Sequence, residues 1–124
     1  MQLVVLGLNH RSAAVEVRER FSFEKNEVES ALNRLYEYEK ISECVILSTC
    51  NRTEIYAVLE DVQSPKGYML DVLKHLKHAD TIDESAFFFY EEKACIDHLF
   101  RVSASLDSLV LGEGQILSQL KGAY

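Results

Sequence analysis

Short apolar runs alternate along the chain with stretches in which apolar residues recur every three or four positions. The runs lie at Leu3–Leu8, Cys44–Cys50 and Glu54–Glu60. Their length and their content of β-branched residues predict buried strands. Only three residues separate the second run from the third, which predicts a tight antiparallel connection or a loop at the strand ends. The aromatic segment Phe87–Tyr90 predicts a further strand.

Helical spacing begins after Ser22, where glutamates occupy the first turns and the helix dipole favours negative charge. The apolar stripe of this helix consists of Val28, Ala31, Leu32 and Leu35. Ser64 and Pro65 predict the start of another helix, as its N-cap and its first-turn residue. Two more helices are expected at about Glu92–Ser105 and Glu113–Tyr124.

The order of these elements through Tyr90 is β-α-β-β-α-β, the split β-α-β pattern of ferredoxin-like folds. We therefore expect an α+β protein with an antiparallel sheet, helices on one face, and extra C-terminal helices. The extra helices either pack beside the sheet or lead into a following domain. Val15 and Val17 alternate with charged residues and fit a short helix or a strand. Ferredoxin-like folds host many functions, so the fold alone decides none.

Composition narrows the class of protein. The chain has 124 residues, 48% of them hydrophobic, which suits one domain with its own core. Its three cysteines are an odd count without close pairing, which favours a reduced, cytoplasmic setting over a disulfide-bonded secreted scaffold. No apolar stretch is long enough to span a membrane. The net charge of -7 argues against nonspecific adhesion to nucleic acid, but it permits a local grip on one end of an RNA.

The segment richest in candidate chemistry is LSTCNRTE, residues 47–54. It places Cys50 among polar residues at the end of a buried run. The thiolate is the nucleophilic form of cysteine, and a guanidinium such as that of Arg52 favours it. Thr49 and Asn51 offer hydrogen-bonding groups for a reacting carbonyl or a polar substrate. From these residues alone, Cys50 is as readily the last buried residue of a strand as a nucleophile.

The other cysteines and the histidines carry weaker signals. Cys44 and Cys95 lie in apolar or helical surroundings, so we expect them to be structural. His98 lies within a predicted helix beside apolar residues, a setting more typical of a core histidine than of a catalyst. His75 and His78 are three apart on one helix, but no third ligand is evident, and no metal site is expected.

A glycine-rich segment, Gly112–Gly114, resembles part of a phosphate-binding loop. The strand, turn and helix that such a loop requires do not surround it, so we reject a nucleotide motif here. Gln115 and Gln119 stand one turn apart on a shared helix face. Their apolar neighbours favour a buried polar role for this pair.

Three long segments make the chain recognisable: GLNHRSAAVEVRERFSF, LSTCNRTEIY and RVSASLDSLVLGEGQILSQLKGAY. Together they resemble the glutamyl-tRNA reductase family, and the resemblance covers essentially the whole chain. It implies an NADPH-dependent enzyme whose cysteine thiolate attacks the glutamyl ester of glutamyl-tRNA. The resulting thioester is reduced to glutamate-1-semialdehyde, the first step of tetrapyrrole biosynthesis, which leads to 5-aminolevulinate, porphyrin and haem.

The resemblance also implies roles for individual residues. Cys50 takes the nucleophile position of the family, and His98 matches a histidine considered important for activity. The positions that match substrate-binding residues are Thr49, Asn51, Arg52, Ser108, Glu113, Gly114, Gln115 and Gln119. Gly114 stands where many members have proline, a departure that affects the local backbone and leaves the chemistry unchanged.

Members of this family continue into an NADPH-binding Rossmann domain and a helical dimerisation domain. This sequence has no dinucleotide fingerprint, so residues 1–124 are expected to form a single catalytic domain that binds glutamyl-tRNA. The resemblance implies a full-length homodimer, glutamate-1-semialdehyde aminomutase as a partner, a cytoplasmic location and no membrane association. One alternative stays open, a ferredoxin-like regulatory module in which Arg52 and Glu113 bind an amino acid without catalysis. A purely structural interaction domain is the other.

Overall fold

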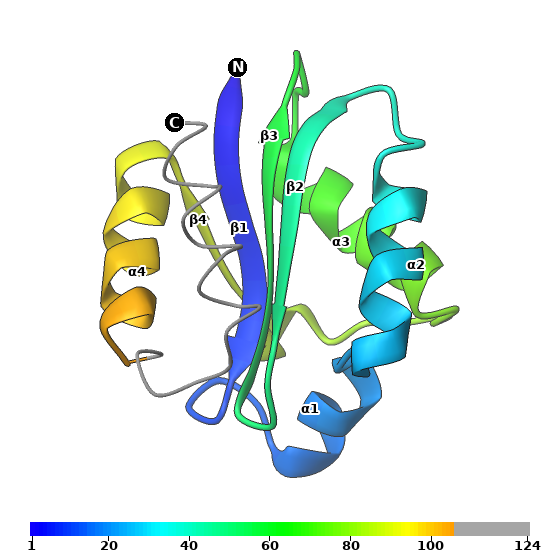
Figure 1. The fold of residues 1–124 in the computed structure, drawn as a ribbon, viewed down its shortest axis with the longest axis vertical. Coiled ribbons are helices and arrows are strands. Elements are labelled where there is room, and N and C mark those ends of the chain that lie inside the picture. Colours follow the sequence, from blue (N-terminus) through cyan, green and yellow to red (C-terminus); the bar gives the residue numbers. More distant parts are fainter. Residues whose placement is uncertain (106–124) are drawn as a thin grey trace.

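The structure is a computed structural model that describes residues 1–105, and these form a four-stranded antiparallel sheet with helices on both faces (Figure 1). The strands are β1 (Gln2–Asn9), β2 (Ile41–Ser48), β3 (Arg52–Leu59) and β4 (Phe88–Glu91). The helices are α1 (Val15–Phe21), α2 (Lys25–Leu35), α3 (Pro65–Leu76) and α4 (Glu92–Ser105). A short 3-10 helix, η1 (Glu84–Ala86), precedes β4.

The strands follow the order β2-β3-β1-β4 across the sheet, so β1 and β3 are the central pair. Their register places Asn9 opposite Arg52. In the neighbouring pair, Ser48 lies opposite Thr53, and the hairpin at 49–51 joins the two strands. The hairpin and the loop after β1 therefore meet at the same end of the sheet, and this end carries the polar groups described below.

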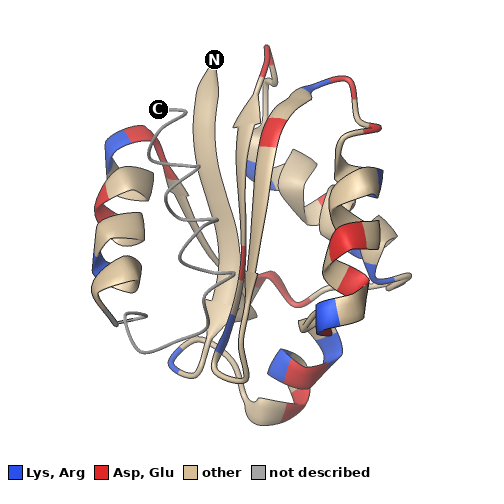
Figure 2. Ribbon diagram, viewed as in Figure 1, with Lys and Arg blue, Asp and Glu red and all other residues tan. Residues whose placement is uncertain are grey.

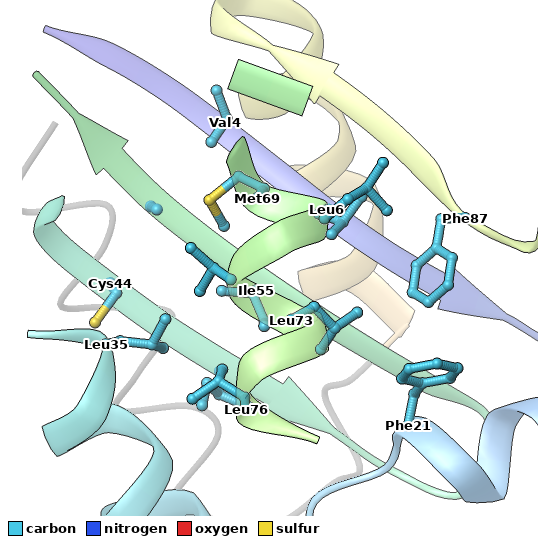
Figure 3. Close-up of a cluster of buried hydrophobic side chains, with 14 of the residues drawn as sticks. Val4, Leu6, Phe21, Leu35, Cys44, Ile55, Met69, Leu73, Leu76 and Phe87 are labelled. Carbon is cyan, nitrogen blue, oxygen red and sulfur yellow. The ribbon is translucent and has the colours of Figure 1, made fainter. Parts of the chain in front are cut away.

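One face of the sheet packs against α1, α2 and α3. Figure 3 shows Met69 and Leu73 of α3 directed toward Val4, Leu6 and Ile55 of the strands, and all five side chains are buried. Each such side chain contributes about 1.5–3 kcal/mol when it is fully removed from water. This face holds the larger of the two hydrophobic cores.

The opposite face packs against α4. Its buried residues alternate with those of the first face along the strands, as the two-residue period of a β-strand requires. They are Leu3, Val5, Val45, Leu47, Tyr56, Val58, Cys95, Leu99 and Val102. Because the strands carry apolar residues on both faces, a helix must cover each.

Local sequence explains where the helices begin and end. α2 starts with a capping box between Glu24 and Glu27, which satisfies backbone N–H groups of the first turn. α3 starts with Pro65 in its first turn, and Ser64 is its N-cap as predicted, although that side chain makes no capping hydrogen bond. The Arg34 guanidinium donates to the last carbonyl groups of α3 and so joins the ends of two helices.

The structure confirms the α+β class, the antiparallel sheet and the tight connection between the second and third strands. The prediction that helices lie on one face of the sheet is correct for α2 and α3. The helix α4, which was expected as an extra helix, covers the other face. The ambiguous segment around Val15 is the helix α1. The helix expected at 113–124 lies outside the described residues. Within residues 1–105, no helix has the length and apolar character needed to cross a membrane.

Candidate active site

Cys50 lies in the hairpin between β2 and β3, and its side chain is exposed. The backbone N–H of Thr49 donates to the Arg52 carbonyl at 2.8 Å. In return, Thr49 Oγ1 accepts from the N–H groups of Asn51 and Arg52, each at 3.2 Å. Side-chain acceptors of this kind fix tight turns. Thr49 therefore holds the backbone that presents the thiol.

The hollow beside Cys50 has a volume of about 430 Å³ and lies between the hairpin, α1 and the start of α2. The Phe23 backbone N–H donates to Ser48 Oγ at 2.9 Å, which ties the connection between the helices to the base of the hairpin. Arg18 and Lys25 line this hollow together with acidic neighbours. The residues that line the hollow beside Cys50 therefore carry both positive and negative charges.

A buried glutamate, Glu54, organises the opposite face of the sheet. Its side chain is fully buried. Its Oε2 accepts from Arg52 Nη1 at 2.9 Å and lies 2.9 Å from His98 Nε2. Its Oε1 accepts from the Tyr56 hydroxyl at 2.5 Å. Three side chains thus meet one carboxyl group, which no sequence motif had singled out as functional.

These partners keep Glu54 ionised. Burial raises the pKa of Glu54, but the hydrogen bond and charge of His98, the Tyr56 hydroxyl and the charge of Arg52 outweigh it and hold the pKa below 4.5. A carboxylate has no proton to donate, so Nε2 of His98 must carry the hydrogen that they share. In a neutral ring, this leaves Nδ1 as the accepting nitrogen. The carboxylate therefore sets the tautomer of His98.

Close packing holds the His98 ring in place. Its centroid lies 4.8 Å from that of Phe88 and 5.1 Å from that of Tyr90. Gly7 of β1 makes this arrangement possible, because a Cβ there would lie 2.7 Å from Phe88 Cζ and 2.9 Å from Glu54 Cγ. A side chain at this position would collide with both the aromatic ring and the carboxylate arm.

A cavity of about 630 Å³ opens beside this cluster, between the loop after β1, the strands β3 and β4, and α4. Its basic lining residues are His10, Arg11, Arg52, His98 and Arg101. The structure thus brings Arg52 and His98, two of the predicted site residues, to one cavity. Cys50 lines the other hollow.

Comparison with known proteins identifies the family. The family model described as glutamyl-tRNA(Glu) reductase, N-terminal domain, matches residues 6–124. The chain belongs to this family. It is 48% identical to a glutamyl-tRNA reductase of Synechococcus sp. and 42% identical to one of Bacillus subtilis, covering 100% of this chain and 28% of each relative.

A solved structure gives the same result. The glutamyl-tRNA reductase from Methanopyrus kandleri matches 98% of this chain with a TM-score of 0.56 and 32% identity. The match spans 27% of that chain. The sequence therefore corresponds to well under half the length of these glutamyl-tRNA reductases, and it matches the N-terminal domain of the family.

The residues expected to act in a glutamyl-tRNA reductase domain fall into three groups. Thr49, Cys50 and Asn51 form the hairpin, and Arg52 and His98 line the cavity on the α4 face. The remaining predicted residues, Ser108, Glu113, Gly114, Gln115 and Gln119, lie outside the described residues. Arg52 forms an ion pair with Glu54, and within residues 1–105 no contact between its guanidinium and the Cys50 sulfur is recorded. Stabilisation of the Cys50 thiolate by Arg52 stays a prediction.

The other two cysteines are buried, as expected for structural residues of this domain. Burial raises the pKa of the Cys44 thiol to about 11 and that of Cys95 to about 12. Both thiols are therefore protonated and shielded at neutral pH. Within the described part of the chain, no group of three potential metal-binding side chains occurs.

Proposed function

We propose that this domain accepts the glutamyl group of glutamyl-tRNA on Cys50. The observation that carries the proposal is an exposed cysteine on a hairpin fixed by side-chain hydrogen bonds, in a chain of the glutamyl-tRNA reductase family. The Cys50 thiolate attacks the carbonyl carbon of the ester. The bond from this carbon to the ribose oxygen breaks, the tRNA leaves with that oxygen protonated, and a thioester remains on the enzyme.

Arg52 is proposed to bind a carboxylate of the glutamyl group. Among residues 1–105, the one hydrogen bond recorded for its five-donor guanidinium runs from Nη1 to Glu54, which leaves further N–H groups to bind a planar anion. His98 is proposed to accept or deliver a proton through Nδ1, because Glu54 occupies Nε2. The proposed contacts outside the described residues are Ser108, Glu113, Gly114, Gln115 and Gln119. Thr49 and Asn51 are proposed to act in the hairpin.

The described residues do not fit NADPH. Their sheet is antiparallel throughout, whereas a dinucleotide site of the Rossmann type needs a parallel strand, a glycine-rich turn and a helix. We propose that NADPH is bound, and the thioester reduced to the semialdehyde of tetrapyrrole biosynthesis, by residues outside 1–105.

For the whole protein we further propose a cytoplasmic homodimer with glutamate-1-semialdehyde aminomutase as a partner. The strand order supports a ferredoxin-like fold.

Mass spectrometry of the intact domain after incubation with glutamyl-tRNA tests the acyl transfer. We expect one glutamyl adduct on the wild type and none on Cys50→Ser. The matched controls, Cys44→Ser and Cys95→Ser, should keep the adduct, provided that circular dichroism shows them folded. Uncharged tRNA should give no adduct with any of them. Equal loss of the adduct from all three folded variants would contradict a special role for Cys50.

A second candidate is the amino-acid-binding module without catalysis. The observation that favours it is that Arg52 and Cys50 line separate hollows. In that case, free glutamate would raise the thermal unfolding midpoint of the domain in a manner dependent on Arg52. Glutamyl-tRNA would leave Cys50 unmodified. The same mass measurement therefore separates the two functions.

A further inference from the structure

Basic side chains gather around the cavity of about 630 Å³, although the chain carries a net charge of -7. Figure 2 shows basic residues on the loop after β1, at the start of β3 and on α4. These elements contribute Arg11, Arg52 and Arg101 to the cavity, and none of its described lining residues is acidic. The cavity is therefore a cationic site on an acidic protein.

The three arginines differ in their partners. Arg52 forms an ion pair with Glu54. Arg11 and Arg101 are exposed, and within residues 1–105 neither of them takes part in any of the recorded ion pairs. From two different elements, the cavity is thus lined by two arginines that form no ion pair with any residue in 1–105.

Hydrogen bonds of Asn9 and Ser12 hold the turn that carries Arg11. Asn9 Oδ1 accepts from the N–H groups of Arg11 and Ser12 at 2.9 and 3.1 Å. The N–H of Asn9 in turn donates to Ser12 Oγ at 2.9 Å. Arg101 starts from α4, which is anchored by buried Leu99 and Val102 on the sheet. Both arginines therefore start from backbone held by hydrogen bonds or by packing, so binding an anion between them requires ordering of their side chains only.

We propose that Arg11 and Arg101 bind phosphate groups of the RNA strand beside the 3′ end that carries the glutamyl ester. The inference rests on the proposed function, which supplies an RNA as substrate. A guanidinium matches phosphate oxygens with two parallel hydrogen bonds. The glutamyl group has one free carboxylate, which is already assigned to Arg52. It would therefore leave the positive charges of Arg11 and Arg101 without an anionic partner on the substrate. Phe88 and Tyr90 line the same cavity and add aromatic surface on which a base can stack.

The overall charge of the chain makes these two residues important. At a net charge of -7, most of the surface repels RNA, so binding depends on a few local cations. Each phosphate contact contributes to the salt dependence of affinity, because it releases counterions from the RNA. Removing both arginines should therefore reduce the slope of log affinity against log salt concentration by a measurable amount.

The test measures binding of uncharged glutamate-accepting tRNA to the protein over a series of salt concentrations. For Arg11→Gln/Arg101→Gln, we expect the slope of log affinity against log salt to fall by about one per arginine. Affinity at low salt should fall about tenfold or more per arginine, as expected for charge-assisted hydrogen bonds. The matched control is Lys66→Gln/Lys93→Gln, which removes the same charge at exposed positions outside the cavity lining. It should change the slope much less.

A second measurement separates this inference from the proposed function. Glutamate α-benzyl thioester is an acyl donor without RNA, and it should acylate Cys50 equally in the wild type and in Arg11→Gln/Arg101→Gln. Circular dichroism checks separately that the double variant is folded. If glutamyl-tRNA and the thioester both fail to acylate the wild type, the proposed function is wrong, whereas the tRNA-binding result still decides the phosphate site. A wild type that does not bind tRNA, or equal losses in the double variant and the lysine control, would overturn the phosphate site.

Discussion

Replacement of Gly7 by alanine should destabilise the protein, although alanine is usually the better residue in a strand. The added Cβ would lie 2.7 Å from Phe88 Cζ, 2.8 Å from the Thr53 carbonyl oxygen and 2.9 Å from Glu54 Cγ. The Thr53 oxygen belongs to the backbone of a central strand, so it cannot turn aside. Overpacking of this kind costs about 1–3 kcal/mol. The lower unfolded-state entropy of alanine offsets about 0.5–1 kcal/mol of that, which leaves a net loss of about 0–2.5 kcal/mol. Because all three contacts are shorter than 3.0 Å, we expect a loss in the upper part of this range, about 1–2 kcal/mol.

Urea unfolding followed by far-ultraviolet circular dichroism measures this loss without requiring tryptophan, which the chain lacks. The matched control is Gly67→Ala in α3, whose Cβ would have the rotatable Ser64 Oγ at 3.2 Å as its nearest neighbour, with Ser64 Cβ at 4.0 Å. There the helix propensity of alanine should raise stability by up to about 1 kcal/mol. Two glycine-to-alanine changes should thus have opposite signs. A Gly7→Ala variant as stable as the wild type would refute the argument that Gly7 makes room for Glu54 and Phe88.

Two further substitutions test the contacts of charged side chains, those of the buried Glu54 and those of Arg34 at the C-terminal end of α3. Glu54→Gln should cost about 3 kcal/mol at neutral pH, because it leaves the largely buried Arg52 guanidinium without its counter-ion. The folded-state pKa of Glu54 is lowered from 4.5, so its contribution is complete above that value and is lost as the pH falls through the lower folded pKa. The difference in free energy of unfolding between the wild type and Glu54→Gln should therefore shrink below about pH 4.5. Urea unfolding at neutral pH and below pH 4.5 measures this difference, and the same value at both would contradict the prediction. Arg34→Met removes hydrogen bonds to the carbonyl oxygens of His75 and Leu76 at 2.9 and 3.2 Å. It should lower the free energy of unfolding by about 1–2 kcal/mol, measured by thermal unfolding. No measurable loss would contradict the role of Arg34 at the end of α3.

Hydrophobic pattern predicted most of the fold because the strands and long helices have strong periodicity. The run at Leu3–Leu8 lies within β1, and the helix expected at about Glu92–Ser105 corresponds to α4. The helix α1 was ambiguous because it has seven residues and buries only Phe21. Valines two positions apart fit either period in so short a segment. The choice of face for α4 depends on tertiary packing, which a single sequence does not contain.

From the residues alone, the candidate site is predictable only where its members are neighbours in sequence. The polar residues that directly follow a buried run make Cys50 a candidate, and the resemblance to the family supplies its nucleophile role and the distant positions such as His98. Glu54 was missed because one glutamate at the start of a strand is normally exposed. Its burial depends on His98, 44 positions later, and on the missing side chain at Gly7. The alternation of Arg52, Glu54 and Tyr56 on one strand face was the signal available in the sequence.

The proposed function gives the buried cluster around Glu54 a role beyond stability. Replacing a buried ion pair with apolar side chains of similar volume is often neutral or stabilising, so stability alone does not account for a carboxylate in this core. Its geometry has a specific effect, because it fixes the ring of His98 and one edge of the Arg52 guanidinium beside a cavity. Arg52 also directly follows the hairpin that presents Cys50. A change at Glu54 should therefore disturb substrate alignment before it unfolds the domain, and acylation of Cys50 should be more sensitive to Glu54→Gln than the fold is.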